Sequence, residues 1–303
     1  MATNSTAFPI GVPGVQDGTK LSVDVLLNRP QVIAQDLANI LNQGFWISDV
    51  FDMAGSTDSG SVAVEKPNTV ASDLYLTRDV ERTEPLAEAP ILNADRGEIE
   101  VLPVETWTGK YVISKEARRR NDIRQFNNNQ QKLANTMERK LHIRGVDVID
   151  AAATTYSRAV AAPQTLTTAI GVAGSSKKDT DTVFAAWAIG QSSAIGEERG
   201  VEYDTVLLNQ AESLKIGYAI GFNNVKDAFA SLGLNAIISP RVPAGTSYML
   251  AAKKFGGFAW EQQPTVEVSD YQTRFRGWEV EGEAAFVPYV DNPYAIYKIT
   301  TLA

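Results

Sequence analysis

Residue types that often carry protein chemistry are absent or rare in this chain of 303 residues. There is no cysteine, which excludes disulfides, thiolate zinc sites and cysteine nucleophiles, and fits a protein that folds in a reducing cytoplasm. The chain has no basic region followed by an apolar core at its start, and no run of about 18 apolar residues, so the sequence predicts neither a signal peptide nor a membrane-spanning helix. We therefore expect a soluble protein that is made in the cytosol and has no membrane partner.

The charge balance limits what the protein binds. Lys and Arg total 28 and Asp and Glu total 36, which gives a net charge of −8. A protein that binds phosphate groups over its whole surface is therefore excluded, although a local basic patch stays open. With 44% hydrophobic residues the chain has enough apolar side chains for a substantial core, so disorder as its main state is excluded too.

The first part of the chain is predicted to be an extended arm followed by a short helix. Residues 1–29 are rich in Thr, Pro, Gly, Asn and Asp, which is typical of an arm that is either disordered or docked on a partner. From Pro30, which suits a first helical turn, to Gly44, which suits a stop, the apolar residues recur at helical spacing. The next stretch, FWISDVFDM, is interpreted as a buried strand or turn.

A long excursion follows, from residue 54 to about residue 98. The short apolar alternations SVAVE and DLYLTRDV are separated by polar loops, which predicts two extended arms with turn residues between them. A stretch with so few large apolar side chains does not form a core of its own. The excursion must therefore project or lie against another surface, which is a physical demand for a partner.

The longest predicted helix runs from about Ser114 to Ala153, with Ser114 as its candidate N-cap. One narrow apolar stripe recurs along it, formed by Ile123, Phe126, Leu133, Met137, Leu141 and Val148. Only Gly145 interrupts the pattern, so we expect a spine helix that is covered on one side.

The remainder of the chain alternates helices and strands and then ends in strands. A helix is predicted within 181–200, followed by the strand YDTVLLN and a helix that begins at AESLKIGYAIG. The inward-facing residues of the helix within 181–200 are expected to be Val183, Phe184, Trp187 and Ile195. Residues 232–303 read as strands throughout, separated by Gly, Pro and Asn-Pro turns.

No motif predicts a catalytic site. The single histidine, His142, lies among basic residues in mid-helix, a poor setting for a general base, so we interpret it as a solvated or interface residue. Ser192 in GQSSA lies within a predicted helix and lacks the second glycine of a nucleophile elbow. The segment GVAGSSKK, which begins at Gly171, lacks the spacing of a phosphate-binding loop and is expected to be a flexible loop. We therefore predict no catalytic residue and no cofactor.

Three charged clusters are candidates for contacts. One acidic cluster is Glu81, Glu84 and Glu88 in the excursion, and a second is Glu279, Glu281 and Glu283, whose alternation places them on one face of a strand. For the second cluster we favour a basic partner strand or solvation over a divalent ion, so no metal site is predicted. The basic cluster is Arg118, Arg119, Arg120 and Arg124. Three alternatives are open for this cluster: contact with nucleic acid, pairing with the acidic arm of a neighbouring molecule, or contact with solvent alone. Of these we favour pairing with the neighbouring molecule.

The order of these elements resembles that of the HK97-like major capsid proteins of tailed bacteriophages, over essentially the whole chain. ERTEPLAEAPIL followed by WTGKYVISKEARRRND looks like the stretch that leads from that family's extended loop into its spine helix, and GWEVEGEAAFVPYVDNPYAIYKIT looks like its closing strands. The resemblance implies an α+β fold with an N-terminal arm, an extended β-hairpin loop, a long spine helix, and peripheral and axial domains. The implied divisions are 1–45 for the arm with its short helix, 46–98 for the extended loop, 99–159 with 256–303 for the peripheral domain, and 160–255 for the axial domain.

The resemblance also implies a function. Subunits of this family form pentamers and hexamers that close into an icosahedral shell around double-stranded DNA, so we expect a structural protein of the virion, assembled in the host cytoplasm, that encloses DNA without sequence-specific binding. Scaffold, portal and decoration proteins are further partners; the segment before the first helix is too short for a cleaved scaffold region, so we expect a separate scaffold protein or none. An encapsulin-type nanocompartment shares the fold and stays an alternative. A cytosolic α/β enzyme is the alternative from another class.

Overall fold

The computed structural model describes most of the chain from Trp46 onward. The described residues are 46–66, 80, 82, 97–163, 166, 184–197, 201–221, 224–274 and 276–302, together with Val23, Leu27, Ile33 and Leu37. Ile33 and Leu37 are helical and buried, in agreement with the helix predicted from Pro30. The other residues of that helix, the arm before Val23 and the segment GVAGSSKK lie outside the described residues.

Helices and β-sheets both contribute to the described part of the protein. The helices are α3 (Ile47–Val50), α4 (Lys115–Arg120), α5 (Ile123–Thr155), α8 (Ala185–Gly196), α9 (Gln210–Ile220), α10 (Val225–Ser231) and the 3-10 helix η3 (Pro293–Ala295). The strands are β1 (Asp52–Ser56), β2 (Ser61–Glu65), β3 (Ile99–Pro103), β4 (Glu105–Ser114), β5 (Ala159–Ala161), β6 (Thr205–Leu208), β7 (Asn235–Ile238), β8 (Ser247–Leu250), β9 (Gly256–Val268), β10 (Gly277–Val290) and β11 (Ile296–Thr300). The predicted α+β class is confirmed. Among the described residues no helix is both long enough and apolar enough to cross a membrane.

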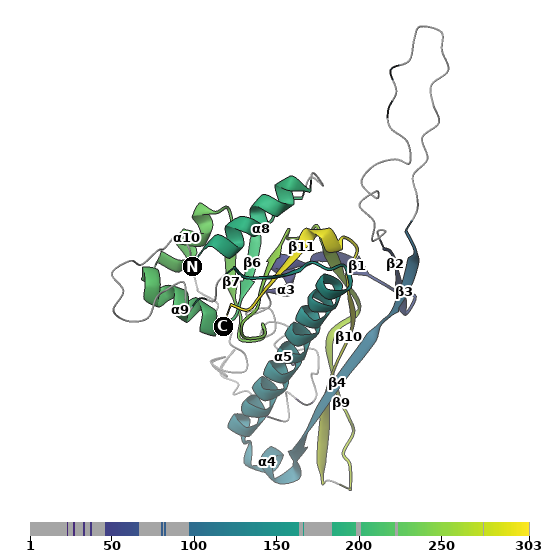
Figure 1. Ribbon diagram of the computed structural model, residues 1–303. Helices are drawn as coiled ribbons and strands as arrows, with labels where there is room; N and C mark the ends of the chain where they lie inside the picture. Colours follow the sequence, from purple (N-terminus) through teal and green to yellow (C-terminus); the bar gives the residue numbers. More distant parts are fainter. Residues whose placement is uncertain are drawn as a thin grey trace, which may run out of the picture.

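The first sheet has four strands in the order β1-β9-β10-β4. β10 is antiparallel to both β9 and β4, whereas β1 is parallel to β9. β9 has 13 residues and β10 has 14. The segments FAWEQ and TVEVSDY are predicted as separate strands, but FAWEQ and the first part of TVEVSDY form the single strand β9. The 33-residue helix α5 lies along one face of these long strands (Figure 1).

Alternation along the strands determines which side chains meet α5. Val280 and Ala284 of β10 are buried in a cluster with residues of α5, so the alternate residues Glu279, Glu281 and Glu283 face away from the helix. Gly109 of β4 is paired with Gly282 of β10 in the middle of this face. A Cβ atom on Gly109 would lie 2.9 Å from a methyl carbon of Leu133 in α5. The two glycines therefore let the helix approach the sheet closely.

The predicted spine is two helices rather than one. The hydroxyl of Ser114 accepts a hydrogen bond from the backbone N–H of Ala117 at 3.1 Å, so the predicted N-cap is confirmed, but for the short helix α4. Asn121 then adopts the left-handed conformation (φ 53°), which asparagine tolerates better than most residues. Asp122 caps the new helix α5 by accepting a hydrogen bond from the backbone N–H of Gln125.

Gly145, which interrupts the apolar stripe in the sequence, lies inside the continuous helix α5, where another helix packs closely on it. A Cβ atom at Gly145 would lie 3.2 Å from the end of the Ile47 side chain in α3. FWISDVFDM, predicted as a strand or turn, forms the short helix α3 and then β1, with the fully buried Phe51 between them.

The second sheet has five strands in the order β5-β11-β8-β6-β7, with α8, α9 and α10 beside it (Figure 1). The predicted strand at YDTVLLN and the helix at AESLKIGYAIG are confirmed as β6 and α9. No helix is predicted where α10 forms. Ile195 of α8, expected inward, is 71% exposed, because α8 packs instead through Trp187 and small residues such as Gly190. Val183 lies outside the described residues.

The excursion begins as β2, which forms an antiparallel hairpin with β3 (Figure 1). The predicted arm SVAVE is thereby confirmed, whereas the arm DLYLTRDV lies outside the described residues apart from Val80. The closing strand β11 pairs with β5 and β8 of the second sheet rather than with the first sheet. The division into peripheral and axial domains stays a prediction.

Candidate assembly surfaces

The β2–β3 hairpin has one face turned to the protein and one apolar face turned to solvent. Val64 is buried on the inward face. On the outward face Ala63 is paired with Val101, and Glu65 with Ile99. Ile99 is 66% exposed and Val101 61% exposed. The alternation in IEVLP is the sequence signal for this apolar face, but only the register with β2 shows which residues share it.

Both ends of the hairpin are held by its own polar contacts. Lys66 pairs with Glu100 at 2.5 Å, and this hydrogen bond, more than the surrounding charges, raises the pKa of Lys66. The backbone N–H of Lys66 also donates to the carbonyl of Glu98, and that of Val104 donates to the carbonyl of Gly60. Hydrogen bonds therefore close both ends of the hairpin that presents the exposed apolar face.

The predicted basic cluster lies where α4 meets α5, at the end of the long strands. Arg118 is half-buried, with its guanidinium 4.4 Å from the ring centre of Trp278. Arg119, Arg120 and Arg124 are exposed, and within the described ranges no carboxylate lies in ion-pair distance of them. The residues predicted to pair with this cluster, Glu81, Glu84 and Glu88, lie outside the described residues. That pairing stays a prediction.

The second acidic cluster lies on the face of the first sheet that points away from α5. Glu279 pairs with Lys110 of β4 at 3.3 Å, so β4 supplies the basic partner strand. Glu281 lies directly opposite Glu267 of β9, which places like charges side by side. In the part of the chain that the structure describes, no group of three or more His, Cys, Asp or Glu residues is placed to hold a metal ion.

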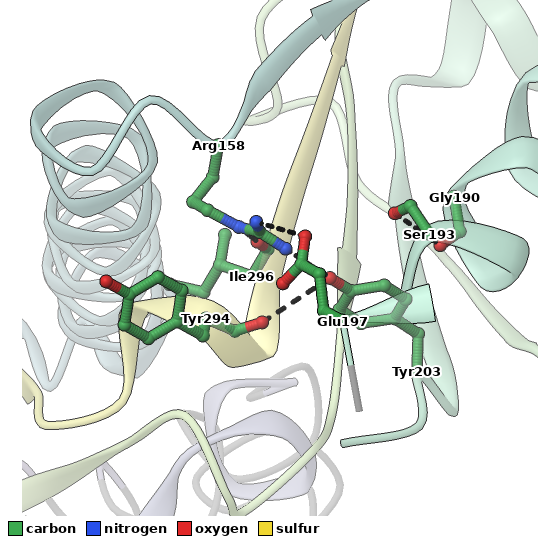
Figure 2. Close-up of polar contacts among 7 residues, drawn as sticks. All are labelled: Arg158, Gly190, Ser193, Glu197, Tyr203, Tyr294 and Ile296. Carbon is green, nitrogen blue, oxygen red and sulfur yellow. Dashed lines mark hydrogen bonds and ion pairs between the residues drawn. The ribbon is translucent and has the colours of Figure 1, made fainter. Parts of the chain in front are cut away.

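A buried polar joint connects the end of the spine to the second sheet; we call it the Arg158 joint. Figure 2 shows the guanidinium of Arg158 pointing toward Glu197 and Tyr203. It donates to Glu197 at 2.6 Å, to the Tyr203 hydroxyl at 3.0 Å and to the Ile296 carbonyl at 3.2 Å, while the Tyr203 hydroxyl donates to the Tyr294 carbonyl at 3.4 Å. Burial lowers the pKa of Arg158, but the bonds to Glu197 and Tyr203 outweigh it, so the pKa is raised and the side chain stays charged.

A second polar link joins the same two parts of the protein. Asp150 of α5 accepts a hydrogen bond from the Tyr248 hydroxyl at 2.6 Å and pairs with Lys298 of β11 at 2.5 Å. Burial, followed by the bond to Asp150, raises the pKa of Tyr248. The sequence gives no local signal for either link, because the partners are up to 148 positions apart in the chain (Asp150 to Lys298).

The expectation that His142 is solvated or lies at an interface is wrong for the single chain. Its side chain is buried, and its ring stacks on Trp46 with centres 5.2 Å apart, while Nδ1 lies 3.7 Å from a carboxylate oxygen of Glu138. Burial, with a smaller effect from Arg241, lowers the pKa of His142 to about 4. The imidazole is therefore neutral at pH 7.

The described cavities and serines do not form a catalytic site. The GQSSA segment lies inside α8, where the hydroxyl of Ser193 donates to the carbonyl of Gly190 at 3.0 Å (Figure 2). A cavity of about 600 Å³ between α8, α9 and α10 is lined by Phe184, Ala188, Ile220, Asn224, Asp227, Ala228, Ser231 and Leu232. Its single carboxylate, Asp227, has no histidine or lysine beside it among these lining residues, and the hydroxyl of Ser231 donates to the carbonyl of Ala228 at 2.6 Å.

Comparisons with known proteins agree with this geometry. A family model described as phage capsid protein matches residues 98–299, which is more than half of the chain. Three solved structures share the fold: the virus-like particle of Pyrococcus furiosus (11% identity, 89% of this chain, 98% of that chain, TM-score 0.56), Mycobacterium phage Bobi (13%, 86%, 89%, 0.56) and the capsid of Myoviridae phage XM1 (14%, 86%, 91%, 0.52). No curated protein matches the sequence.

The family match and the shared fold bear on the same conclusion as the surfaces described above. The fold expected from the order of elements, that of HK97-like capsid proteins, is confirmed. The chain therefore belongs to the phage capsid protein family and is a structural, non-enzymatic shell protein of the virion capsid.

Proposed function

We propose that the chain assembles into pentamers and hexamers that close into an icosahedral shell around double-stranded DNA, and that assembly takes place in the host cytoplasm. The observation that carries this proposal is the uncovered apolar face of the β2–β3 hairpin, with Ile99 and Val101 more than half exposed. A two-stranded hairpin is marginally stable in water by itself, so an apolar face of this kind favours cover from another surface. A neighbouring subunit supplies that cover in our proposal.

Rings follow from this arrangement because a hairpin on one subunit and its docking surface on the next are different patches. Such head-to-tail contacts close into rings when the rotation between subunits allows it. We propose that the axial domain, 160–255, faces the ring centre, while the peripheral domain, 99–159 with 256–303, forms the outer part. The exposure of Ile195 and Tyr218, at 71% and 74%, supports the axial assignment because both offer apolar surface.

The basic cluster supplies a second contact in this proposal. Arg118, Arg119, Arg120 and Arg124 of one subunit pair with Glu81, Glu84 and Glu88 in the extended loop, 46–98, of its neighbour. Support comes from the exposure of Arg119, Arg120 and Arg124 and from the carboxylate-rich sequence of the loop. Many modest contacts of this kind stabilise a closed shell through avidity. The N-terminal arm, 1–45, and separate scaffold, portal and decoration proteins are further contacts that we propose.

One second function is kept because of a specific likeness. The similarity to the virus-like particle of Pyrococcus furiosus leaves a nanocompartment of the encapsulin type as an alternative, in which the shell holds protein cargo. The contents distinguish the two proposals. Particles from the native source that contain nuclease-protected double-stranded DNA support the capsid, and particles that contain a packaged enzyme support the nanocompartment.

Assembly itself is tested with the full chain expressed alone. Negative-stain electron microscopy, combined with light scattering for the particle mass, is expected to show closed shells or five- and six-membered rings. A monomer of 32.9 kDa that persists at high concentration and with a candidate scaffold protein contradicts the proposal.

A further inference from the structure

The two sides of the unit formed by α5 and the first sheet carry opposite charge. The sheet face that points away from α5 bears Glu267, Glu279, Glu281 and Glu283. Among the residues paired with these glutamates on neighbouring strands, Lys110 is the one cation. On the other side, α5 has its exposed residues on the face opposite the buried residues that pack on the sheet. From Ile123 to Ile143 this helix contains one carboxylate, Glu138, which is half-buried beside His142. A chain with a net charge of −8 thus has a side that is free of exposed acid along much of its longest helix.

One line of exposed residues follows this free surface, and we call it the spine stripe. It consists of Arg124, Asn128, Lys132, Asn135 and Arg139, all exposed. Arg124 also belongs to the basic cluster, so the stripe meets the proposed subunit contact at this end. Successive members are three or four residues apart, which places them on one side of the helix. At 1.5 Å per residue the stripe spans about 22 Å. Among the described residues no carboxylate lies in ion-pair distance of its three cations.

We propose that the spine stripe binds the phosphate backbone of double-stranded DNA and so marks the inner surface of the shell. Arg and Lys bind phosphate through charge, and Asn hydrogen-bonds to phosphate and sugar, without reading the base sequence. The proposal rests on the proposed capsid function, because it requires DNA inside the shell. Three cations per subunit give weak contacts, which suits a wall along which DNA must move during packaging.

The composition of the stripe favours nucleic acid over a second copy of the chain. Protein interfaces are centred on large apolar or aromatic side chains and are depleted of charge at their core. The hairpin has such residues in Ile99 and Val101, but the stripe has only charged and amide side chains. The exposed Ile143 lies beyond its end.

The test compares two charge-reversed forms of the full chain. Lys132→Glu with Arg139→Glu alters the stripe, and Lys226→Glu with Lys254→Glu makes the same change in net charge at exposed lysines on other elements. Binding of the unassembled chain to a short labelled DNA duplex of mixed sequence is measured by fluorescence anisotropy between roughly 50 and 200 mM salt. Each phosphate contact contributes about −0.9 to the slope of log affinity against log salt, so wild type is expected near about −2.7.

The expected result is that the stripe variant loses at least about tenfold in affinity at low salt and has a slope nearer about −1, while the control variant binds like wild type. Equal loss in both variants, unchanged binding in the stripe variant, or no binding by wild type overturns the proposal. Electron microscopy of the same samples reports assembly separately. If wild type forms no shells but the loss is confined to the stripe variant, the capsid proposal fails and the DNA-binding stripe stands; if only shell formation is lost, the stripe is a subunit contact.

Discussion

His142 makes the stability of the chain depend on pH. In the unfolded chain the imidazole titrates near pH 6.5, whereas in the fold its pKa is lowered to about 4. Between these values the unfolded chain binds a proton that the folded chain does not, so the free energy of unfolding falls as the pH drops below 6.5. The expected loss is about 2 kcal/mol by about pH 5, measured by urea unfolding of the unassembled chain.

The matched variant is His142→Phe, which keeps an aromatic ring against Trp46 and removes the titration. Burial raises the pKa of the neighbouring Glu138, with Arg241 opposing it, and that contribution is common to both proteins. The fall in stability below pH 6.5 should therefore be smaller in the variant. The same pH dependence in both proteins would show that protonation of His142 is not the cause.

The Arg158 joint should be worth more than an ion pair on the surface. The Arg158 side chain is 11% exposed, so Arg158→Met leaves the Glu197 carboxylate and the Tyr203 hydroxyl without their donor. The expected cost is roughly 3 kcal/mol of unfolding free energy. Lys66→Met, which breaks the exposed pair with Glu100, should cost less than about 1 kcal/mol. Chemical denaturation of both variants checks this, and similar losses would contradict the ranking.

Close packing between elements depends on particular glycines. A Cβ atom on Gly277 at the start of β10 would lie 2.3 Å from the carbonyl oxygen of Ile113 in β4, so the backbone of one strand must shift. Gly277→Ala is therefore expected to cost about 2 kcal/mol or more. Gly196→Ala is the control, because no atom outside the helix lies within 4 Å of a Cβ there and alanine favours helix. Thermal unfolding compares the two, and equal stability would contradict the close contact.

The break between α4 and α5 is also an element-scale feature. It places the basic cluster on both sides of a corner rather than along one straight helix, because Asn121 turns the chain and Asp122 starts a new helix. The corner therefore holds Arg118 against Trp278 and leaves Arg119 and Arg120 exposed beside it.

At the scale of the whole molecule, folding and assembly should be separable. Ile99→Lys with Val101→Lys places charge on the uncovered face of the hairpin, away from the buried Val64. The unfolding free energy of the single chain is expected to change by less than about 0.5 kcal/mol, because these side chains are already solvated. Shells and rings should be absent in electron micrographs.

The conservative pair Ile99→Val with Val101→Ile is the control for this experiment. It keeps the face apolar and close to its original size, so assembly should match that of wild type. Normal shells from the lysine variant would show that this face is not covered by a neighbour. Loss of assembly from both variants would indicate a sensitivity to shape rather than to charge.

Local periodicity is the reason why much of this protein could be predicted from its sequence. The apolar stripe of the spine, the N-cap at Ser114, the strand YDTVLLN and the strand SVAVE all depend on residues close together in the chain. The same holds for the basic cluster, whose members are within seven positions of one another, from Arg118 to Arg124. The period of 3.6 or 2 residues and the helix caps are written locally, so they need no knowledge of distant partners.

Contacts between distant segments decided the rest. The sequence alone did not place His142 against Trp46, Arg158 against Glu197, or Gly109 against Gly282, because each pair is brought together by sheet register and helix packing. Register also determined that Ile99 and Val101 share an open face and that acidic residues cover the side opposite α5. Sequence thus determined most of the described helices and strands, and the tertiary structure decided which of their faces are buried, since burial depends on what the rest of the chain places against them.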